Sequence, residues 1–344
     1  MTLHMLDMTI DDLRRAVAAA GHKAYRADQL ADWVYRKGLV DPARMSNVPA
    51  SVSGLVDVLT SRLVQRAESD DGCVKLLLEL HDGHRVETVL IPTSRRATAC
   101  VSTQVGCAMG CAFCASGMDG LARNLAAAEI LEQVLHLQVA AGRKATHVVF
   151  MGMGEPLANY DATLAAVRAL VDPARFGLSA RRITVSTVGV PDRIRALAQE
   201  EMPITLAISL HAPNDTIRRE LIPAAKRYRL DDVLAAAQEF YHSRNREITL
   251  EYALLGGVND SIACADDLAA IAGRLRCSVN LIGYNPVSGL PFVSPAKRAA
   301  SAFASRLTSR GVNVTVRRPR GLGIDGACGQ LRRRAARGPG HGPR

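Results

Sequence analysis

Aromatic residues are scarce in this 344-residue sequence, where Phe, Trp and Tyr together make up 4% of the chain. The scarcity argues against a broad stacking platform for single-stranded nucleic acid, because such platforms are built from aromatic side chains. No run of about 18 uncharged apolar residues occurs, so we expect no transmembrane helix. Residues 1–15 include Asp7, Asp11 and Asp12, whereas an export signal has a basic start and an unbroken apolar stretch. We therefore expect a cytoplasmic globular protein, whose length fits about two domains.

Positive charge is in excess and is concentrated near the C-terminus. The chain has 43 Lys and Arg against 33 Asp and Glu, which gives a formal net charge of +10. Residues 317–344 contain eight arginines, from Arg317 to Arg344, and one acidic residue, Asp325. A clustered basic segment attracts phosphate groups. This tail fits nucleic-acid binding and a merely solvated extension equally well.

Cysteines cluster in one short part of the chain, because four of the eight fall between residues 100 and 114. In a reducing compartment, clustered cysteines are metal ligands or catalytic groups more often than disulfide partners. Cys107, Cys111 and Cys114 have the spacing CxxxCxxC, which can hold three irons of a [4Fe–4S] cluster and leave one iron open. Electron-transfer clusters use four cysteines. Structural zinc is the alternative, but it needs a fourth Cys or His, and none follows within twenty residues of Cys114.

Two regions with different hydrophobic patterns divide the chain. Residues 8–64 have apolar residues at helical spacing, with a break at Val48-Pro49. Turn signals predict a β-hairpin with strands at 73–80 and 85–91. Beyond residue 97, β-rich runs alternate with amphipathic helical stretches, which predicts βαβ units around a parallel sheet. The expected strands are 99–103, 147–151, 183–186, 205–209, 248–252, 279–284 and 312–316.

Six or seven such units in about 220 residues favour a partial (βα) barrel over a complete eightfold one. An open, doubly wound sheet is the competing architecture. In both, ligands gather at the carboxyl ends of the strands, and polar segments follow four of the expected strands here. They contain Glu155 in the segment GMGEP, Ser186, the segment starting at Ser209, and Asn285. We expect them to share a pocket, although a tight turn or a helix cap is the competing explanation for each.

These motifs resemble the radical S-adenosylmethionine (SAM) superfamily, in which CxxxCxxC follows the first strand of a partial barrel. The whole set resembles its RlmN/Cfr family, whose members methylate an adenine of 23S ribosomal RNA. Further matching segments are residues 25–30 (YRADQL), 123–125 (RNL), 221–224 (LIPA) and 323–331 (GIDGACGQL). Cys100, seven residues before the first cluster cysteine, and Cys328 make the resemblance specific. Leu121 departs from the family pattern in the loop after Cys114.

The resemblance implies a fold with four parts. These are an N-terminal helical RNA-docking domain (1–70), a β-hairpin extension (71–96), a radical SAM partial (βα)6 barrel of the α/β class (97–316), and a C-terminal segment with the methyl-carrying cysteine and the basic tail (317–344). Cys73, Cys264 and Cys277 match no family motif, and we expect them to pack in the core.

The resemblance also implies a role for each site residue. Cys107, Cys111 and Cys114 hold the [4Fe–4S] cluster. One SAM methylates Cys328, and a second is cleaved to a radical that takes hydrogen from that methyl group before carbon adds to the adenine. Cys100 then releases the product and forms a transient disulfide with Cys328, and Glu87 is the proton acceptor. The implied SAM contacts are Gly154, Glu155, Ser186, Ser209, Leu210, His211 and Asn285.

The implied product is 2-methyladenosine at position 2503 of 23S ribosomal RNA, and at position 37 of transfer RNAs. Methylation of carbon 8 of the same ribosomal adenosine uses the same cysteines and stays open. Two competing functions also stay open, namely a non-catalytic iron–sulfur RNA-binding protein and a radical SAM enzyme for a small molecule. The expected partners are RNA and an electron donor of the reductase, flavodoxin or ferredoxin type, with no membrane, and the protein is expected to be a monomer.

Overall fold

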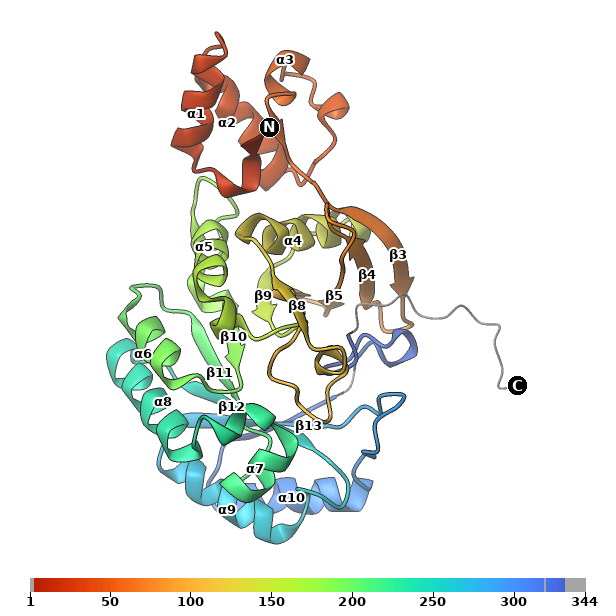
Figure 1. The fold of residues 1–344 in the computed structure, drawn as a ribbon, viewed down its shortest axis with the longest axis vertical. Coiled ribbons are helices and arrows are strands. Elements are labelled where there is room, and N and C mark those ends of the chain that lie inside the picture. The colour runs from red at the N-terminus through yellow and green to blue at the C-terminus, as the bar shows by residue number, and fades with distance from the viewer. Residues whose placement is uncertain (1–2, 319, 332–344) are drawn as a thin grey trace, which may run out of the picture.

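The computed structural model describes residues 3–318 and 320–331, and a ten-stranded mixed sheet is its centre (Figure 1). The Arg-rich end of the expected tail, from Arg332 to Arg344, lies outside the described residues. Seven strands run parallel to one another, in an order across the sheet that follows their order along the chain. They are β6 (Ala97–Cys100), β9 (His147–Phe150), β10 (Ile183–Thr187), β11 (Thr205–Ser209), β12 (Ile248–Leu254), β13 (Cys277–Gly283) and β14 (Val314–Arg317).

Each of the six connections between these strands contains at least one helix, which confirms the predicted partial (βα)6 barrel. The helices are α4 (Ala127–Ala141), α5 (Tyr160–Val171), α6 (Pro191–Gln199), α7 (Asp215–Leu221), α8 (Leu230–Arg244), α9 (Ile262–Gly273) and α10 (Lys297–Ser309). In Figure 1, α6, α8, α9 and α10 form an outer layer along the curved sheet. Within the described ranges, no helix is long and apolar enough to span a membrane.

The predicted hairpin is part of a larger antiparallel extension of the barrel sheet. β3 (Arg62–Glu68), β4 (Val74–Glu79) and β5 (Arg85–Pro92) pair in succession, and β5 pairs antiparallel with β6. The helical pattern at residues 8–64 therefore predicts the structure wrongly beyond α3 (Ala50–Ser53), because β2 (Val56–Asp57) and the start of β3 follow there. The sequence of β3 is rich in residues with good helix propensity, but propensity is a weak preference and pairing with β4 overrides it.

The N-terminal region is helical, as its apolar spacing predicts. Its strand and α-helices before α3 are β1 (Leu3–His4), α1 (Ile10–Ala19) and α2 (Tyr25–Ala31), and β1 pairs with β2. Thr9 caps α1, because its side chain accepts from the Asp12 amide while the Asp12 carboxylate accepts from the Thr9 amide. Leu13, Val17 and Leu30 are fully buried between these helices.

Glu132 on α4 fastens the N-terminal region to the barrel. Its buried carboxylate accepts hydrogen bonds from the Thr60 and Ser61 amides at 2.6 Å and 2.9 Å, and it pairs with His4 at 2.7 Å. Burial alone would raise the pKa of Glu132, but these partners together hold it at about 2. The carboxylate is therefore charged at neutral pH and binds three points of the preceding chain.

The strand registers bring one set of side chains to one face of the sheet. Directly paired residues point to the same face, and so does every second residue along a strand. Val89 pairs with Cys100, Cys100 with Val149, Ser209 with Glu251, and Ile282 with Arg317. Followed across the sheet, this face carries Glu87, Cys100, Val149, Ser186, Ser209, Glu251 and Arg317. Sequence positions more than 200 residues apart thus share one surface.

Candidate active site

A closed loop after β6 carries the three clustered cysteines. The short strands β7 (Gln104–Gly106) and β8 (Leu121–Asn124) pair antiparallel, and the Cys107 amide donates to the Gly120 carbonyl at 3.2 Å. Gly117 is closely packed, because a Cβ there would lie 3.1 Å from the Gly110 Cα. The loop folds tightly, and Cys107, Cys111 and Cys114 line one pocket.

The donor set of this pocket fits an iron–sulfur cluster better than a single zinc ion. Among the described residues, no three Cys, His, Asp or Glu side chains surround the position of one metal ion. A cluster instead takes each thiolate on a different iron. Burial raises the pKa of Cys107 to about 12 and also raises the pKa of Cys111 and Cys114, so a positively charged group is needed to keep the three as thiolates.

The segment GMGEP forms the next wall of the pocket and is also a tight turn. Gly154 has φ +100°, and a Cβ there would lie 2.6 Å from the Gln104 Cβ, so only glycine fits. The buried Glu155 carboxylate accepts from the Leu157 and Val188 amides at 3.0 Å and 2.9 Å. Burial raises the pKa of Glu155. Glu155 therefore caps a helical turn and also lines the pocket. The two explanations that its sequence segment left open both apply.

His211 presents a neutral imidazole to the same pocket. Its Nδ1 accepts from the Ala253 amide at 3.0 Å, which leaves the proton on Nε2 as a donor. Burial lowers the pKa of His211 to about 3. Its φ of 54° is left-handed, and Asn259 donates to its carbonyl at 2.7 Å and so supports this conformation.

Most of the predicted SAM contacts meet in this pocket. Ser186 and Ser209 have their hydroxyl oxygens 3.1 Å apart at the ends of β10 and β11, and Asn285 follows β13. Leu210 differs, because its side chain is fully buried away from the pocket and its amide donates to the Glu251 carbonyl. Glu87 on β5 does not line the pocket either, but its amide donates to the sulfur of Met153, which lies between the lining residues Gly152 and Gly154.

A second cavity adjoins the first at Cys328. Cys100, Val149 and Arg317 line this second cavity, and Cys328 and Arg317 line both. Burial, followed by the nearby Cys328, raises the pKa of Cys100 to about 12. All eight cysteines are free thiols, so the disulfide that the resemblance implies between Cys100 and Cys328 is not present. Cys100 and Cys328 therefore lie near each other as free thiols and are not joined by a disulfide.

The segment that carries Cys328 is fastened to the cysteine loop. The Ala115 amide donates to the Gly329 carbonyl at 2.8 Å, and the Ser116 hydroxyl donates to the Leu331 carbonyl at 2.9 Å. Asp71 accepts from the Gly321 amide at 3.1 Å on the antiparallel extension. Cys328 is thus held between the loop of Cys114 and the extension that bears Glu87.

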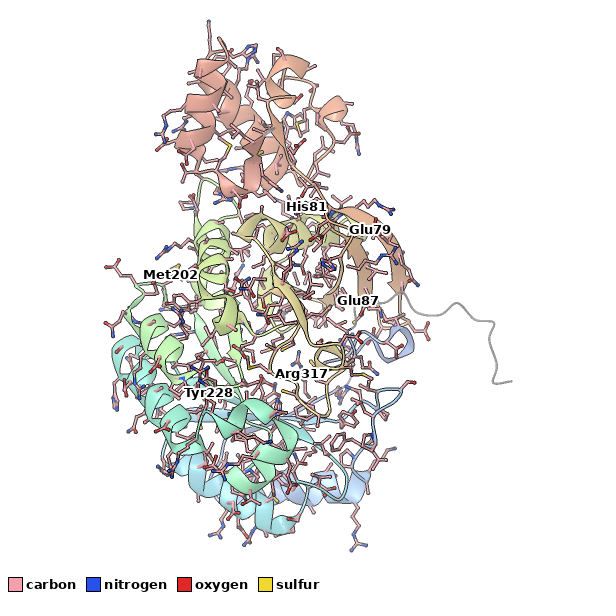
Figure 2. All side chains as sticks on the ribbon, in the orientation of Figure 1. Glu79, His81, Glu87, Met202, Tyr228 and Arg317 are labelled. Carbon is pink, nitrogen blue, oxygen red and sulfur yellow. The ribbon has the colours of Figure 1, made fainter. Side chains whose placement is uncertain are left out.

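Sequence reasoning missed two charged residues of this site. Arg317 was counted with the basic tail, but it ends β14 and points into the barrel, where the neighbouring Cys328 and Glu251 raise its pKa. Lys75 pairs with Glu87 at 3.0 Å on the neighbouring strand. Figure 2 labels Glu87 and Arg317 in the middle of the molecule, away from the outer helices. Alternation along β14 places Arg317 on the face opposite Val314 and Val316, so the sequence pattern would assign it to the outside, and nothing local marks Lys75.

Parallel strands around a pocket that begins with CxxxCxxC define the radical SAM class. In agreement, residues 101–266 match the family model described as "Radical SAM superfamily". Residues 3–54 match the "Ribosomal RNA large subunit methyltransferase N-terminal domain". The superfamily implies an iron–sulfur cluster and SAM as cofactors.

Similar proteins cover nearly the whole chain. "Probable dual-specificity RNA methyltransferase RlmN" of Gloeobacter violaceus is 44% identical over 98% of this chain and 97% of its own. The protein of the same name from Thermosynechococcus vestitus is 44% identical over 95% of this chain and 98% of its own. A solved radical SAM methyltransferase from Sphaerobacter thermophilus is 42% identical with a TM-score of 0.93, over 96% of this chain and all of that one. The chain belongs to the RlmN family of radical SAM RNA methyltransferases.

Proposed function

We propose that this chain methylates carbon 2 of adenosine 2503 in 23S ribosomal RNA, and of adenosine 37 in transfer RNAs, through a methyl group carried on Cys328. The observation that carries the proposal is the position of Cys328, which lines both the pocket of the cysteine loop and the cavity of Cys100. A thiol at this junction can receive a methyl group on one side and deliver carbon on the other. The names of the relatives support two classes of RNA substrate.

The first pocket binds the cofactors in this account. Cys107, Cys111 and Cys114 would hold a [4Fe–4S] cluster through their thiolates, and SAM would bind beside it in the same pocket. When bound, the cluster and SAM supply the methyl group and the radical that activates it. Glu155 and the Nε2–H of His211 offer an acceptor and a donor to SAM, and the hydroxyls of Ser186 and Ser209 complete its polar wall. Asn285, Gly154 and the main chain at Leu210 are the remaining contacts.

The second cavity and its surroundings handle the RNA base. The Cys328 thiolate is the nucleophile that accepts the first methyl group. Cys100, on the same sheet face, is the thiol that releases the product from its covalent adduct with Cys328. Glu87 is the proton acceptor, and its carboxylate lies 3.0 Å from the ammonium of Lys75. The proximity of Cys100 and Cys328 supports catalysis over a non-catalytic RNA-binding protein, which has no use for this pair.

The reaction itself tests the proposal. The protein is purified without oxygen, reconstituted with iron and sulfide, and incubated with SAM, a flavodoxin or ferredoxin reducing system, and unmodified 23S RNA fragment or transfer RNA. Mass spectrometry of the digested nucleosides separates 2-methyladenosine from 8-methyladenosine, and we expect the 2-methyl product. The 8-methyl product contradicts the assigned carbon, and cleavage of SAM without RNA methylation contradicts the substrate.

We further propose that the active form is a monomer, which sedimentation of the reconstituted protein tests.

A further inference from the structure

Arg218 on α7 is a buried cation without an anionic partner in contact. Its side chain is 1% exposed, and it is the largest fully buried side chain among the described residues. Its two terminal nitrogens donate to the carbonyls of Tyr228 and Val188, the first at 2.9 Å. In the described part of the chain, no carboxylate lies within ion-pair distance of Arg218, and its buried Nε has no hydrogen-bond partner. Such a buried charge and donor are costly unless something compensates them.

The cysteine loop lies directly against the element that carries Arg218. The carbonyl of Leu221, at the end of α7, accepts from the amide of Ala112 at 2.9 Å, and Ala112 follows Cys111. Leu221 and Ile222 pack in one buried cluster with Phe113. Burial lowers the pKa of Arg218, and the proximity of Asp215 and Cys111 opposes this shift. The hydrogen bond and the shared cluster therefore place the helix of Arg218 directly against the loop that carries Cys111.

Other charged groups near the loop do not offer the same compensation. Glu155 has the same sign as the thiolates and interacts unfavourably with Cys107 and Cys111. His211 is neutral, because burial and Arg218 both lower its pKa. Arg317 lies toward Cys328 and Cys100, in the second cavity. Of these charged side chains, Arg218 is the cation on the helix that contacts the loop next to Cys111.

We propose that Arg218 is a counter-charge for the iron–sulfur cluster and makes the cluster easier to reduce. The inference rests on the proposed function in one respect, namely that the three cysteines hold such a cluster. Reduction adds negative charge to a group already bound by three thiolates, so a cation in the dry interior stabilises the reduced form more than the oxidised form. Net charge and hydrogen bonds to the sulfurs are the factors that set the potentials of such clusters. The partnerless Nε–H of Arg218 is a donor available for such a bond.

A purely structural role is the competing explanation, because Arg218 also ties the chain after β10 to the chain before α8 through Val188 and Tyr228. The reduction potential separates the two roles. The reconstituted protein is titrated with dithionite and mediators, without SAM or RNA, and reduced cluster is counted by electron paramagnetic resonance. For R218M we expect the ratio of reduced to oxidised cluster, at the wild-type midpoint, to fall about tenfold, which corresponds to about 59 mV for one electron.

Two further variants control this comparison. R219M removes a charge from the same helix at an exposed position, where Arg219 lies 4.0 Å from Asp215, and we expect a wild-type midpoint. R218K keeps the charge with different geometry, and we expect its midpoint to stay closer to wild type than that of R218M. If R218M does not fold, R218Q replaces it, because Gln keeps hydrogen-bond donors and lacks the charge.

The measured midpoints distinguish the role of Arg218 from the proposed function of the protein. Equal midpoints for wild type, R218K and the uncharged variant, at equal iron content, overturn the role of Arg218 and leave the proposed function intact. A midpoint shift of R219M as large as that of R218M also overturns it, because the effect is then general charge. A wild-type protein that takes up no iron–sulfur cluster contradicts the proposed function itself.

Discussion

Lys75 Nζ lies 3.0 Å from the Glu87 carboxylate, and both side chains are almost completely buried on neighbouring antiparallel strands. The same ammonium donates to the carbonyl of Asp325 at 3.4 Å, three residues before Cys328. Asp325 has a left-handed φ of 50°. One lysine therefore connects the expected proton acceptor with the segment that contains Cys328.

Substitution of Lys75 by Met should both destabilise the protein and slow methylation. Removal of one partner from a buried ion pair costs about 3–5 kcal/mol, because the other charge stays buried. Loss of a positioned general base lowers turnover by about 10²–10⁴-fold. Urea unfolding and single-turnover methylation of RNA measure the two effects. K75R should recover part of both, and a fully active, fully stable K75M protein would contradict the connection described above.

Cys328→Ala should abolish RNA methylation and keep the cluster. The substitution removes the proposed methyl carrier, whereas the three cluster ligands are untouched. Iron content and the visible absorbance show whether the cluster is kept. Nucleoside mass spectrometry shows whether RNA methylation is lost. Cys277→Ala is the matched control, because Cys277 is partly buried at the start of β13 and lines neither cavity. Loss of iron in the Cys328 variant would show that its role has been misassigned.

Cys100→Ala should trap the protein on its RNA. The adduct between Cys328 and the adenine still forms in this account, but the thiol that resolves it is absent. Denaturing gel electrophoresis with labelled RNA should show a covalent complex that wild-type protein does not accumulate. Free methylated RNA at the wild-type rate, with no complex, is the result that excludes a resolving role for Cys100.

Glu132 makes part of the stability dependent on pH. Its pKa is about 2 in the folded protein, below the value of about 4.3 for an unfolded chain, a difference that corresponds to roughly 3 kcal/mol. A lowered carboxyl pKa stabilises the fold above about pH 4.3, and the contribution disappears as the pH falls toward 2. E132Q should therefore unfold at lower urea concentration than wild type at pH 7, and the gap should shrink below pH 4. Equal stability of the two proteins at pH 7 is the contradicting result, and E239Q, on the exposed face of α8, is the control.

Gly154→Ala should damage the cofactor pocket. Its new Cβ would meet Gln104 at 2.6 Å at a φ that favours glycine, so the turn that positions Glu155 must move. We expect a loss of more than about 1 kcal/mol in unfolding free energy and weaker SAM binding. Gly273→Ala is the control, since a Cβ there meets nothing within 4 Å. Calorimetric titration with SAM gives the binding result, and affinity equal to wild type would show that the turn tolerates the side chain.

The parallel barrel could be predicted from the sequence, because its strands are short apolar runs separated by amphipathic helices. All seven expected strands are present, and the one expected at 205–209 has the observed bounds. The three unmatched cysteines also lie in or against the core, as expected. The edge strand β3 was missed because its exposed residues have helix propensity, and only the pairing with β4 makes it a strand.

Site residues that directly follow strands could be predicted from the sequence. Contacts that depend on the register between strands could not. Ser186, Ser209 and Asn285 end up together because parallel strands end at one edge. Lys75 and Glu87 meet through an antiparallel register that no local pattern encodes. Arg218 could not be predicted as a site residue, because the sequence of a short helix does not show whether an arginine on it is buried or exposed.

The central claim is that Cys328 carries the methyl group, and direct observation of that residue tests it. Reconstituted protein is incubated with SAM bearing an isotopically labelled methyl group, without RNA, and then digested for peptide mass spectrometry. The account predicts one labelled methyl group on the peptide that contains Cys328, and its appearance in adenosine once RNA is added. Label that reaches RNA while Cys328 stays unmodified throughout would contradict the account.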